Sequence, residues 1–113
     1  MARGADFYFA EAVLTLRREQ PDVTLEAAIP CEEQASRWRE SDRERYFALV
    51  EQCDLETVVQ RHYDKNCMRR RNRYMVDRSA RLIAVYSGVL GGTMYTLNYA
   101  MSSGVDVVIL ELE

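Results

Sequence analysis

The sequence has few of the residues that build metal centres, disulfide frameworks or membrane anchors. Among 113 residues there is one histidine, and the three cysteines, Cys31, Cys53 and Cys67, are far apart and in no metal-ligand spacing. An odd number of scattered cysteines is typical of reduced, structural thiols. No apolar run approaches transmembrane length, and the residues after Met1 lack the apolar core of a signal peptide. We therefore expect a cytoplasmic protein without a metal site.

Proline and glycine are also scarce, with two and five residues respectively, and the chain has no repeat, low-complexity segment or long linker. This length suits one ordinary domain with a single core, so we expect one domain over residues 1–113. The net charge of −3 says little about partners. Its distribution is uneven, because the stretch from Glu32 to Glu56 is mostly acidic and that from Arg61 to Arg81 is strongly basic.

Hydrophobic periodicity predicts helices and strands in strict alternation. Caps and periodicity predict helices over Asp6–Glu19, over Cys31–Arg39 as a short piece, from a capping box at Ser41–Glu44 to about Cys53, from Asp64 to about Arg78, and from Thr93 to Gly104. Short apolar runs predict strands over Val23–Ile29, Leu55–Gln60, Arg81–Tyr86 and Val105–Leu110. Such alternation implies an α/β fold, with a mostly parallel sheet of about four strands and helices on both faces.

The stretch from Arg81 to Met101 is the most informative part of the chain. An apolar strand leads into the loop Ser87–Thr93, and a helical pattern follows. Gly91, Gly92 and Thr93 leave backbone N–H groups free at the positive end of a helix dipole, which suits a phosphate. The loop matches neither the Walker pattern nor the dinucleotide fingerprint. The alternative is that the glycines only permit a tight turn and Thr93 only caps the helix.

Ligands of open α/β sheets bind beyond the carboxyl ends of the strands. We expect three loops to meet there: the Pro30 loop, the His62–Asp64 turn and the Ser87–Thr93 loop. The start of the chain, including Gly4 and Asp6, should join them, because it precedes a helix without a strand of its own.

The basic helix carries Arg69, Arg70, Arg71 and Arg73, which cannot share one face at about 100° per residue. We expect its buried side to contain Met68, Asn72, Met75 and Val76. Asn72 then either bonds a neighbouring backbone, such as the glycine turn, or contacts a ligand. Arg71 favours a ligand phosphate, since its guanidinium suits bidentate contact.

The other arginines, Arg69, Arg70 and Arg73, are expected to form a solvated face. Contact with nucleic acid through their charges is a minority interpretation, because the chain is acidic overall and exposed aromatics are not interleaved with the arginines. Tyr95 and Tyr99, four residues apart, form either a partner patch or a packing surface against another helix.

Several motifs in order resemble a known family over essentially the whole chain. They are Gly4-Ala-Asp6 with Glu11, the strand end Ala28-Ile-Pro30, Trp38, Tyr46, Arg71-Asn-Arg-Tyr-Met75 with Asp77, Leu82-Ile-Ala-Val-Tyr86 and Gly91-Gly-Thr93. This set resembles the YpsA-like group of the SLOG superfamily, whose folds are related to DprA and to the LOG hydrolases. The resemblance implies a Rossmann-like three-layer α/β/α domain that binds or senses a nucleotide or an ADP-ribose-like ligand.

The implied ligand site gathers the glycine loop, the basic helix and the start of the chain: Gly91, Gly92, Thr93, Arg71, Asn72, Asp6 and Gly4. Longer relatives have a first strand, a helix and a second strand ahead of the Gly-Ala-Asp motif, so the resemblance implies a chain shortened at its N-terminus. LOG hydrolases carry a catalytic glutamate three residues after the loop threonine, where this chain has Thr96. We therefore predict no catalytic residues, no metal and no resident cofactor.

A different class of function is an interaction module. Loss of a leading strand exposes a sheet edge that favours a homodimer or capture of another protein. Small proteins of phages and mobile elements that inhibit host defences, such as CRISPR nucleases, are one example of this alternative, although no residue here points to that role. No membrane contact is expected.

Overall fold

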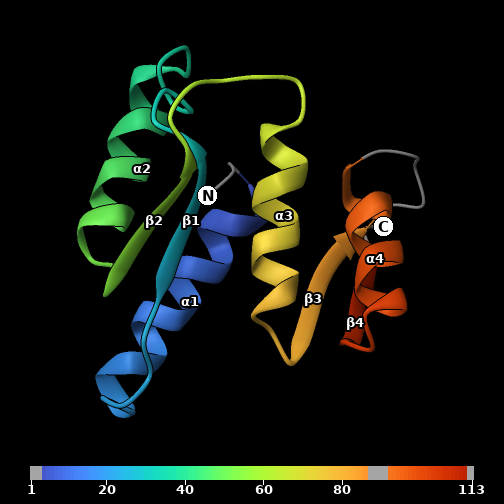
Figure 1. Cartoon of the computed structure of the whole chain (residues 1–113). Helices are drawn as coiled ribbons and strands as arrows, with labels where there is room; N and C mark the ends of the chain where they lie inside the picture. Colours follow the sequence, from blue (N-terminus) through green and yellow to red (C-terminus); the bar gives the residue numbers. More distant parts are fainter. Residues whose placement is uncertain (1–3, 87–91, 112–113) are drawn as a thin grey trace. The chain divides into compact units, whose positions relative to one another are not determined.

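Helices and strands alternate strictly along the chain, as the sequence predicts. The computed structural model describes residues 4–86 and 92–111, and Figure 1 shows the order of their elements. The helices are α1 (Ala5–Glu19), α2 (Glu40–Glu51), α3 (Cys67–Asp77) and α4 (Gly92–Ser102). The strands are β1 (Glu26–Cys31), β2 (Leu55–Gln60), β3 (Arg81–Tyr86) and β4 (Asp106–Glu111). This arrangement confirms the α/β class. None of the described helices is long and apolar enough to cross a membrane.

The strands pair in parallel, two by two. Ala27 of β1 lies opposite Glu56 of β2, and Ile83 of β3 lies opposite Val108 of β4. The chain divides into two compact units, residues 1–63 and residues 64–113, and each contains one pair. Each pair is joined by a helix, α2 or α4, as parallel neighbours require. Four strands with parallel pairing are thus confirmed, whereas the single domain stays a prediction.

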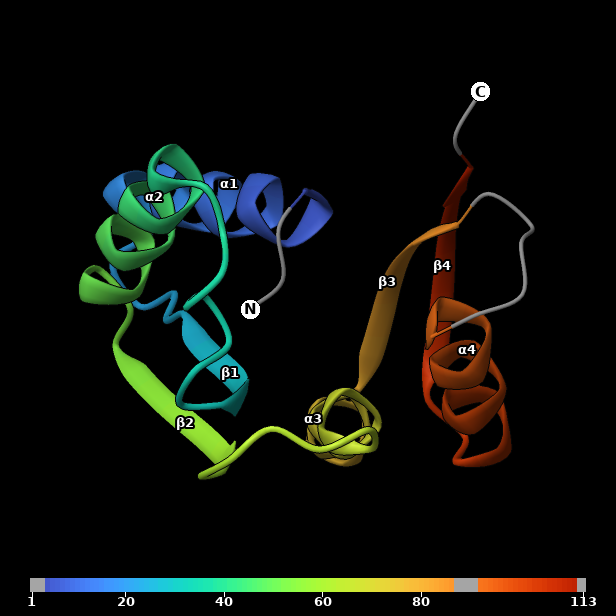
Figure 2. The ribbon, with the colours of Figure 1, turned by 90° about the horizontal axis from the view of Figure 1, so that it is seen from above.

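In the first unit, both helices cover the same side of the β1–β2 pair (Figure 2). Ala27 and Ile29 alternate with residues of the opposite face and are buried against the helices. Phe7 of α1 meets Trp38 edge-to-face at 6.0 Å between ring centroids, and Trp38 meets Tyr46 of α2 at 5.3 Å. Such aromatic contacts favour this geometry, so the rings fix how α2 lies on α1.

An arginine clamp joins the same two helices. Arg45 of α2 donates from Nε to Glu11 Oε1 of α1 at 2.7 Å. Its guanidinium carbon also lies 5.0 Å from the centroid of the Phe7 ring and 5.1 Å from that of Tyr8. The hydrogen bond to Glu11 raises the pKa of Arg45 above its usual value. A guanidinium combines planar stacking with forked hydrogen bonding, which lysine cannot do.

In the second unit, α4 packs on both strands and α3 packs on α4. Ala84 of β3 and Leu97 and Ala100 of α4 are buried. Gly104 adopts a φ of 76°, the left-handed conformation that glycine reaches without a steric penalty, and the chain turns there from α4 toward β4. This is the helix end that the sequence predicts.

Two predicted helix starts are wrong. The capping box at Ser41 does not form, because the Arg39 carbonyl already accepts the N–H of Arg43 at 3.0 Å and α2 begins at Glu40. The helix predicted from Asp64 begins at Cys67. Asp64 instead accepts the Asn66 N–H through Oδ1 at 2.8 Å, which makes a turn before the helix.

The short helix predicted over Cys31–Arg39 is also wrong. Its backbone forms successive turns, in which Gln34 donates to the Cys31 carbonyl, Ser36 to Glu33 and Trp38 to Ala35. These bonds join residues three apart, so the i to i−4 bonds of an α-helix do not develop.

A single carboxylate organises the start of both strands in the first unit. Asp54 Oδ2 accepts the Leu25 N–H at 2.8 Å and a bond from Arg17 Nη1 at 2.8 Å. The Leu25 N–H is thereby taken before the sheet begins, and β1 starts at Glu26 rather than at the predicted Val23. The bond from Leu25, together with Arg17, lowers the pKa of Asp54.

We predict that Asp54→Asn lowers the melting temperature at pH 7, because the ionised carboxylate holds both partners. A lowered pKa in the folded state stabilises the fold above the unfolded value near 3.9, and that stabilisation disappears as pH falls through the folded value. The gap between variant and parent should therefore narrow below about pH 4. Thermal unfolding followed by circular dichroism over a pH series measures this. Asp22→Asn, in an exposed turn, is the control, and an equal gap at all pH values would contradict the assignment.

Candidate functional site

The second unit contains the strand–helix connection that the sequence singles out. β3 ends at Tyr86 and α4 begins at Gly92, with Thr93 exposed in its first turn. The first-turn N–H groups of a helix have no partner within the helix, and they lie at its positive end. Gly91 and the rest of the loop from residue 87 fall outside the described residues.

The buried side of α3 differs from the predicted one. Cys67, Arg71 and Val76 are buried, whereas Met68 is 40% exposed. Arg71 is only 4% exposed, and its Nε donates to Asn72 Oδ1 at 2.8 Å. Asn72 is half-buried, and its amide oxygen accepts the bond from the adjacent Arg71. A buried charge needs such acceptors, because desolvation without them is costly. A bond from Asn72 to the glycine turn stays a prediction.

Four of the predicted site residues lie on two neighbouring helices. Arg71 and Asn72 lie on α3, which packs against α4, the helix that carries Gly92 and Thr93. Gly4 and Asp6 belong to the first unit. That they complete one site with Arg71 and Thr93 stays a prediction.

Gly4 has a local role that the structure does show. Its φ is 78°, and its carbonyl accepts the N–H groups of Phe7 at 3.0 Å and Tyr8 at 3.3 Å. Gly4 therefore opens α1 in a backbone conformation that residues with a side chain rarely adopt. Asp6 lies half-buried in the first turn of α1, where a carboxylate interacts favourably with the helix dipole.

Two of the predicted loops do meet beyond the carboxyl ends of their strands. Glu32 donates its N–H to the Arg61 carbonyl at 3.2 Å, and Glu33 Oε1 accepts the Tyr63 N–H at 2.6 Å. His62 Nδ1 lies 3.9 Å from Glu33 Oε2. The segments after β1 and β2 are thus held to each other by backbone and carboxylate bonds.

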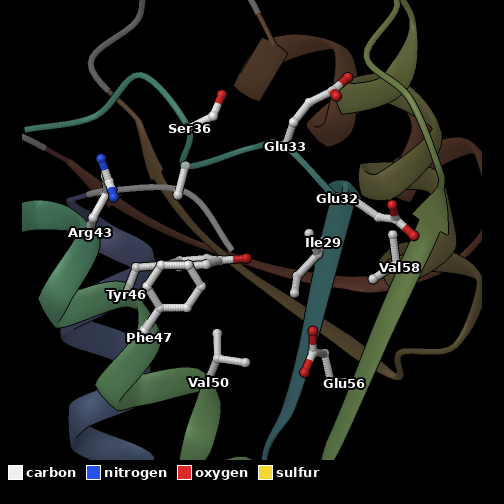
Figure 3. A pocket seen from close by; sticks show the side chains of 11 residues that line it. Ile29, Glu32, Glu33, Ser36, Arg43, Tyr46, Phe47, Val50, Glu56 and Val58 are labelled. Atoms are coloured by element: carbon white, nitrogen blue, oxygen red, sulfur yellow. The ribbon is translucent and has the colours of Figure 1, made fainter.

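A cavity of about 450 Å³ lies beside these loops, between α2 and the strands (Figure 3). Its apolar wall consists of Ile29, Ala35, Tyr46, Phe47, Val50 and Val58. Its polar lining consists of Glu32, Glu33, Glu56, Ser36 and Arg43. Figure 3 shows Arg43 and Glu56 at opposite ends of the hollow. The sequence gives no signal for this cavity, because its wall comes from four separate segments.

Comparison with known proteins gives the family. The family model called YpsA, which is described as the YspA SLOG family, matches residues 2–105. The chain belongs to this family. The alternating elements with parallel strand pairs are those of its Rossmann-like α/β fold.

Similar proteins occur in bacilli. The chain is 32% identical over 85 residues to a UPF0398 protein of Bacillus pumilus, covering 74% of this chain and 46% of that relative. It is 31% identical over 85 residues to a UPF0398 protein of Halalkalibacterium halodurans and to the UPF0398 protein YpsA of Bacillus subtilis, covering 74% of this chain and 45% and 47% of them. The chain thus spans about half the length of the curated relatives it matches.

Two observations bear on chemistry in the described residues. Thr96, at the position where LOG hydrolases carry glutamate, is buried within α4. No group of three or more histidine, cysteine, aspartate or glutamate side chains in residues 4–86 and 92–111 is placed to hold a metal ion.

We predict that Asn72→Ala destabilises the protein by roughly 1–3 kcal/mol, the usual cost of leaving a buried donor without its acceptor, here Arg71 Nε. Denaturant unfolding measures the change. Asn98→Ala, at an exposed position of α4, is the matched control and should be nearly neutral. An Asn72→Ala protein as stable as the control would show that the Arg71–Asn72 bond contributes nothing.

Proposed function

We propose that this protein is a non-catalytic domain that binds a nucleotide or a nucleotide-derived ligand such as ADP-ribose. The observation that carries the proposal is the β3–α4–β4 unit of a SLOG-family chain, in which α4 starts with Gly92 and Thr93 directly after the loop that follows a parallel strand. Ligand phosphates bind helix N-termini in this position of α/β folds, because free N–H groups and the helix dipole both favour an anion.

The neighbouring helix supports an anionic ligand. Arg71 is held in place by Asn72 on α3, which packs against α4. A guanidinium fixed in this way contributes positive charge and loses little side-chain entropy on binding. In the proposal, Gly91, Gly92 and Thr93 contact the phosphate and Arg71 neutralises it. Asn72, Asp6 and Gly4 complete the surroundings.

The absence of catalysis is part of the proposal. A glycosidic bond in a nucleotide breaks more easily when a carboxylate stabilises the positive charge that develops on the ribose. Thr96 carries no charge and is buried, so it does not supply this stabilisation. Binding without turnover is the role of a sensor.

We predict that one member of a panel of nucleotides, NAD and ADP-ribose derivatives raises the melting temperature. A ligand that binds only the folded state stabilises it by about 2.7 kcal/mol at a concentration one hundred times its dissociation constant. Gly92→Asp should abolish the shift, because a carboxylate repels the phosphate at the helix start. Arg71→Ala should weaken it.

The control for this experiment is Gly104→Asn, beyond the C-terminal end of α4. Glycine and asparagine both tolerate the left-handed backbone conformation found there. It should keep the ligand shift. If no compound raises the melting temperature of the parent protein, or if Gly92→Asp keeps the full shift, the phosphate site at α4 is excluded.

Self-association through the second sheet is our second proposal, and one surface favours it. Ile83, Val108 and Leu110 lie on the same face of the β3–β4 pair and are 49%, 38% and 52% exposed. Exposed neighbouring apolar side chains on a sheet are typical of interaction surfaces. The same face carries an ion pair at its start, Arg81 with Asp106 at 2.7 Å, which gives a polar rim.

We predict that the mass measured by light scattering rises from monomer toward dimer as the protein is concentrated. Val108→Glu should keep it monomeric, since the dimer would bury the new carboxylate. Val58→Glu, on the sheet of the first unit and 39% exposed, is the matched control. A parent protein that stays monomeric at all concentrations, or a dimer that survives Val108→Glu, would exclude this surface.

A further inference from the structure

The exposed side of α3 forms a basic surface with aromatic support from α4. Its arginines, Arg69, Arg70 and Arg73, lie within about 100° of one another around the helix and are all exposed, and we call this set the arginine face. Between residues 64 and 81 the sequence has seven arginine or lysine residues against two aspartates. The face therefore carries a local positive potential in a chain that is acidic overall.

Two of these arginines lie on tyrosine rings from the other helix. The guanidinium carbon of Arg69 is 4.8 Å from the Tyr95 ring centroid, and that of Arg73 is 4.6 Å from the Tyr99 ring centroid. Stacking of this kind attracts a cation to the ring face and restricts the side chain. A stacked guanidinium keeps its N–H groups at its edge, where they can donate hydrogen bonds. Arg73 uses this to bond the Tyr99 hydroxyl, which raises the pKa of Arg73.

The two stacks repeat with helical spacing. Arg69 and Arg73 are four residues apart on α3, and Tyr95 and Tyr99 are four apart on α4, so the stacks are about 6 Å apart along the helices. Tyr99 also donates its hydroxyl to Asp77 Oδ1 at 2.5 Å, which fixes its ring against α3. Arg78 also lies on a tyrosine ring, 3.9 Å from the centroid of Tyr74, but on another side of α3.

The carboxylates near this face leave most of its charge uncompensated. Asp64 pairs with Arg70 at 2.7 Å, and Asp77 accepts the bond from Tyr99. Arg69 rests on the Tyr95 ring instead. Arg69, Arg70 and Arg73 thus place three exposed guanidinium groups on one side of α3.

The composition of the arginine face favours nucleic acid over an acidic protein as its partner. The centres of protein interfaces are apolar and depleted of charge. Interfaces with nucleic acid are more polar and much more positive, and arginine binds their phosphates bidentately. Only Met68 among the exposed side chains of α3 is apolar. The face therefore fits a row of phosphates better than it fits a protein.

We propose that the arginine face binds the phosphate backbone of nucleic acid without reading its sequence. The tyrosines lie beneath the guanidiniums, so they support the arginines and do not stack with bases. Phosphate contacts of this kind position a strand but carry no sequence information.

The proposal makes a quantitative statement about salt. With about three phosphate contacts, binding to a single strand should fall roughly 20-fold between about 50 and 200 mM salt, because counterions are released from the nucleic acid. Duplex DNA should show a steeper fall for the same contacts.

The test uses fluorescence anisotropy with labelled single-stranded DNA, single-stranded RNA and duplex DNA of about 20 residues in mixed sequence. The parent should bind in low salt with little preference for sequence. Arg69→Glu with Arg73→Glu should lose at least tenfold in affinity and flatten the salt dependence. Arg69→Lys with Arg73→Lys, which keeps the charge but not the fork, should lose less. Circular dichroism of each variant verifies folding.

The matched control is Arg18→Glu with Arg37→Glu, two exposed arginines of the first unit, which makes the same change in net charge. An equal loss in this control would show that only net charge matters and would overturn the proposal. No binding of the parent in low salt, or tighter binding to a polyglutamate peptide than to nucleic acid, would also overturn it. None of the changed residues belongs to the proposed nucleotide site, so the two proposals fail independently.

Discussion

The parallel pairing of strands that follow one another along the chain is the constraint on which the rest of the structure depends. Two parallel neighbours cannot be joined by a tight turn, so each pair requires a helix that returns the chain to the start of the sheet. α2 provides this return between β1 and β2, and α4 provides it between β3 and β4. Each return helix must bury an apolar side, which explains why Leu49 of α2 and Leu97 of α4 are buried.

Those local requirements are visible in the sequence. β2 and β3 occupy the predicted segments, Leu55–Gln60 and Arg81–Tyr86, because β-branched residues in a run too short for a helix favour a strand. The start of β1 could not be predicted in this way. It depends on a bond from Leu25 to Asp54, which is distant in sequence, and long-range bonds leave no local pattern.

The candidate sites show the same limit. The strand–loop–helix order around Gly92 is local and was predicted, whereas the burial of Arg71 depends on how α3 packs. Nor does any pattern within α3 reveal its aromatic support, because Tyr95 and Tyr99 come from another helix. A search for aromatics interleaved with arginines in one segment therefore misses a surface in which two helices contribute one kind of residue each. The cavity beside α2 could not be predicted for the same reason, because its lining residues come from separate segments.

The bond between Leu25 and Asp54 has a consequence for strand alignment. Asp54 accepts the Leu25 N–H and donates its own N–H to the Leu25 carbonyl at 2.8 Å, so these residues form a closed pair just before Glu26 and Leu55 meet. A slip of one residue would reverse which side chains face the helices. The closed pair fixes which residues of β1 and β2 lie opposite each other where the strands begin. The pairs that follow, from Glu26 with Leu55 to Cys31 with Gln60, keep the same alignment.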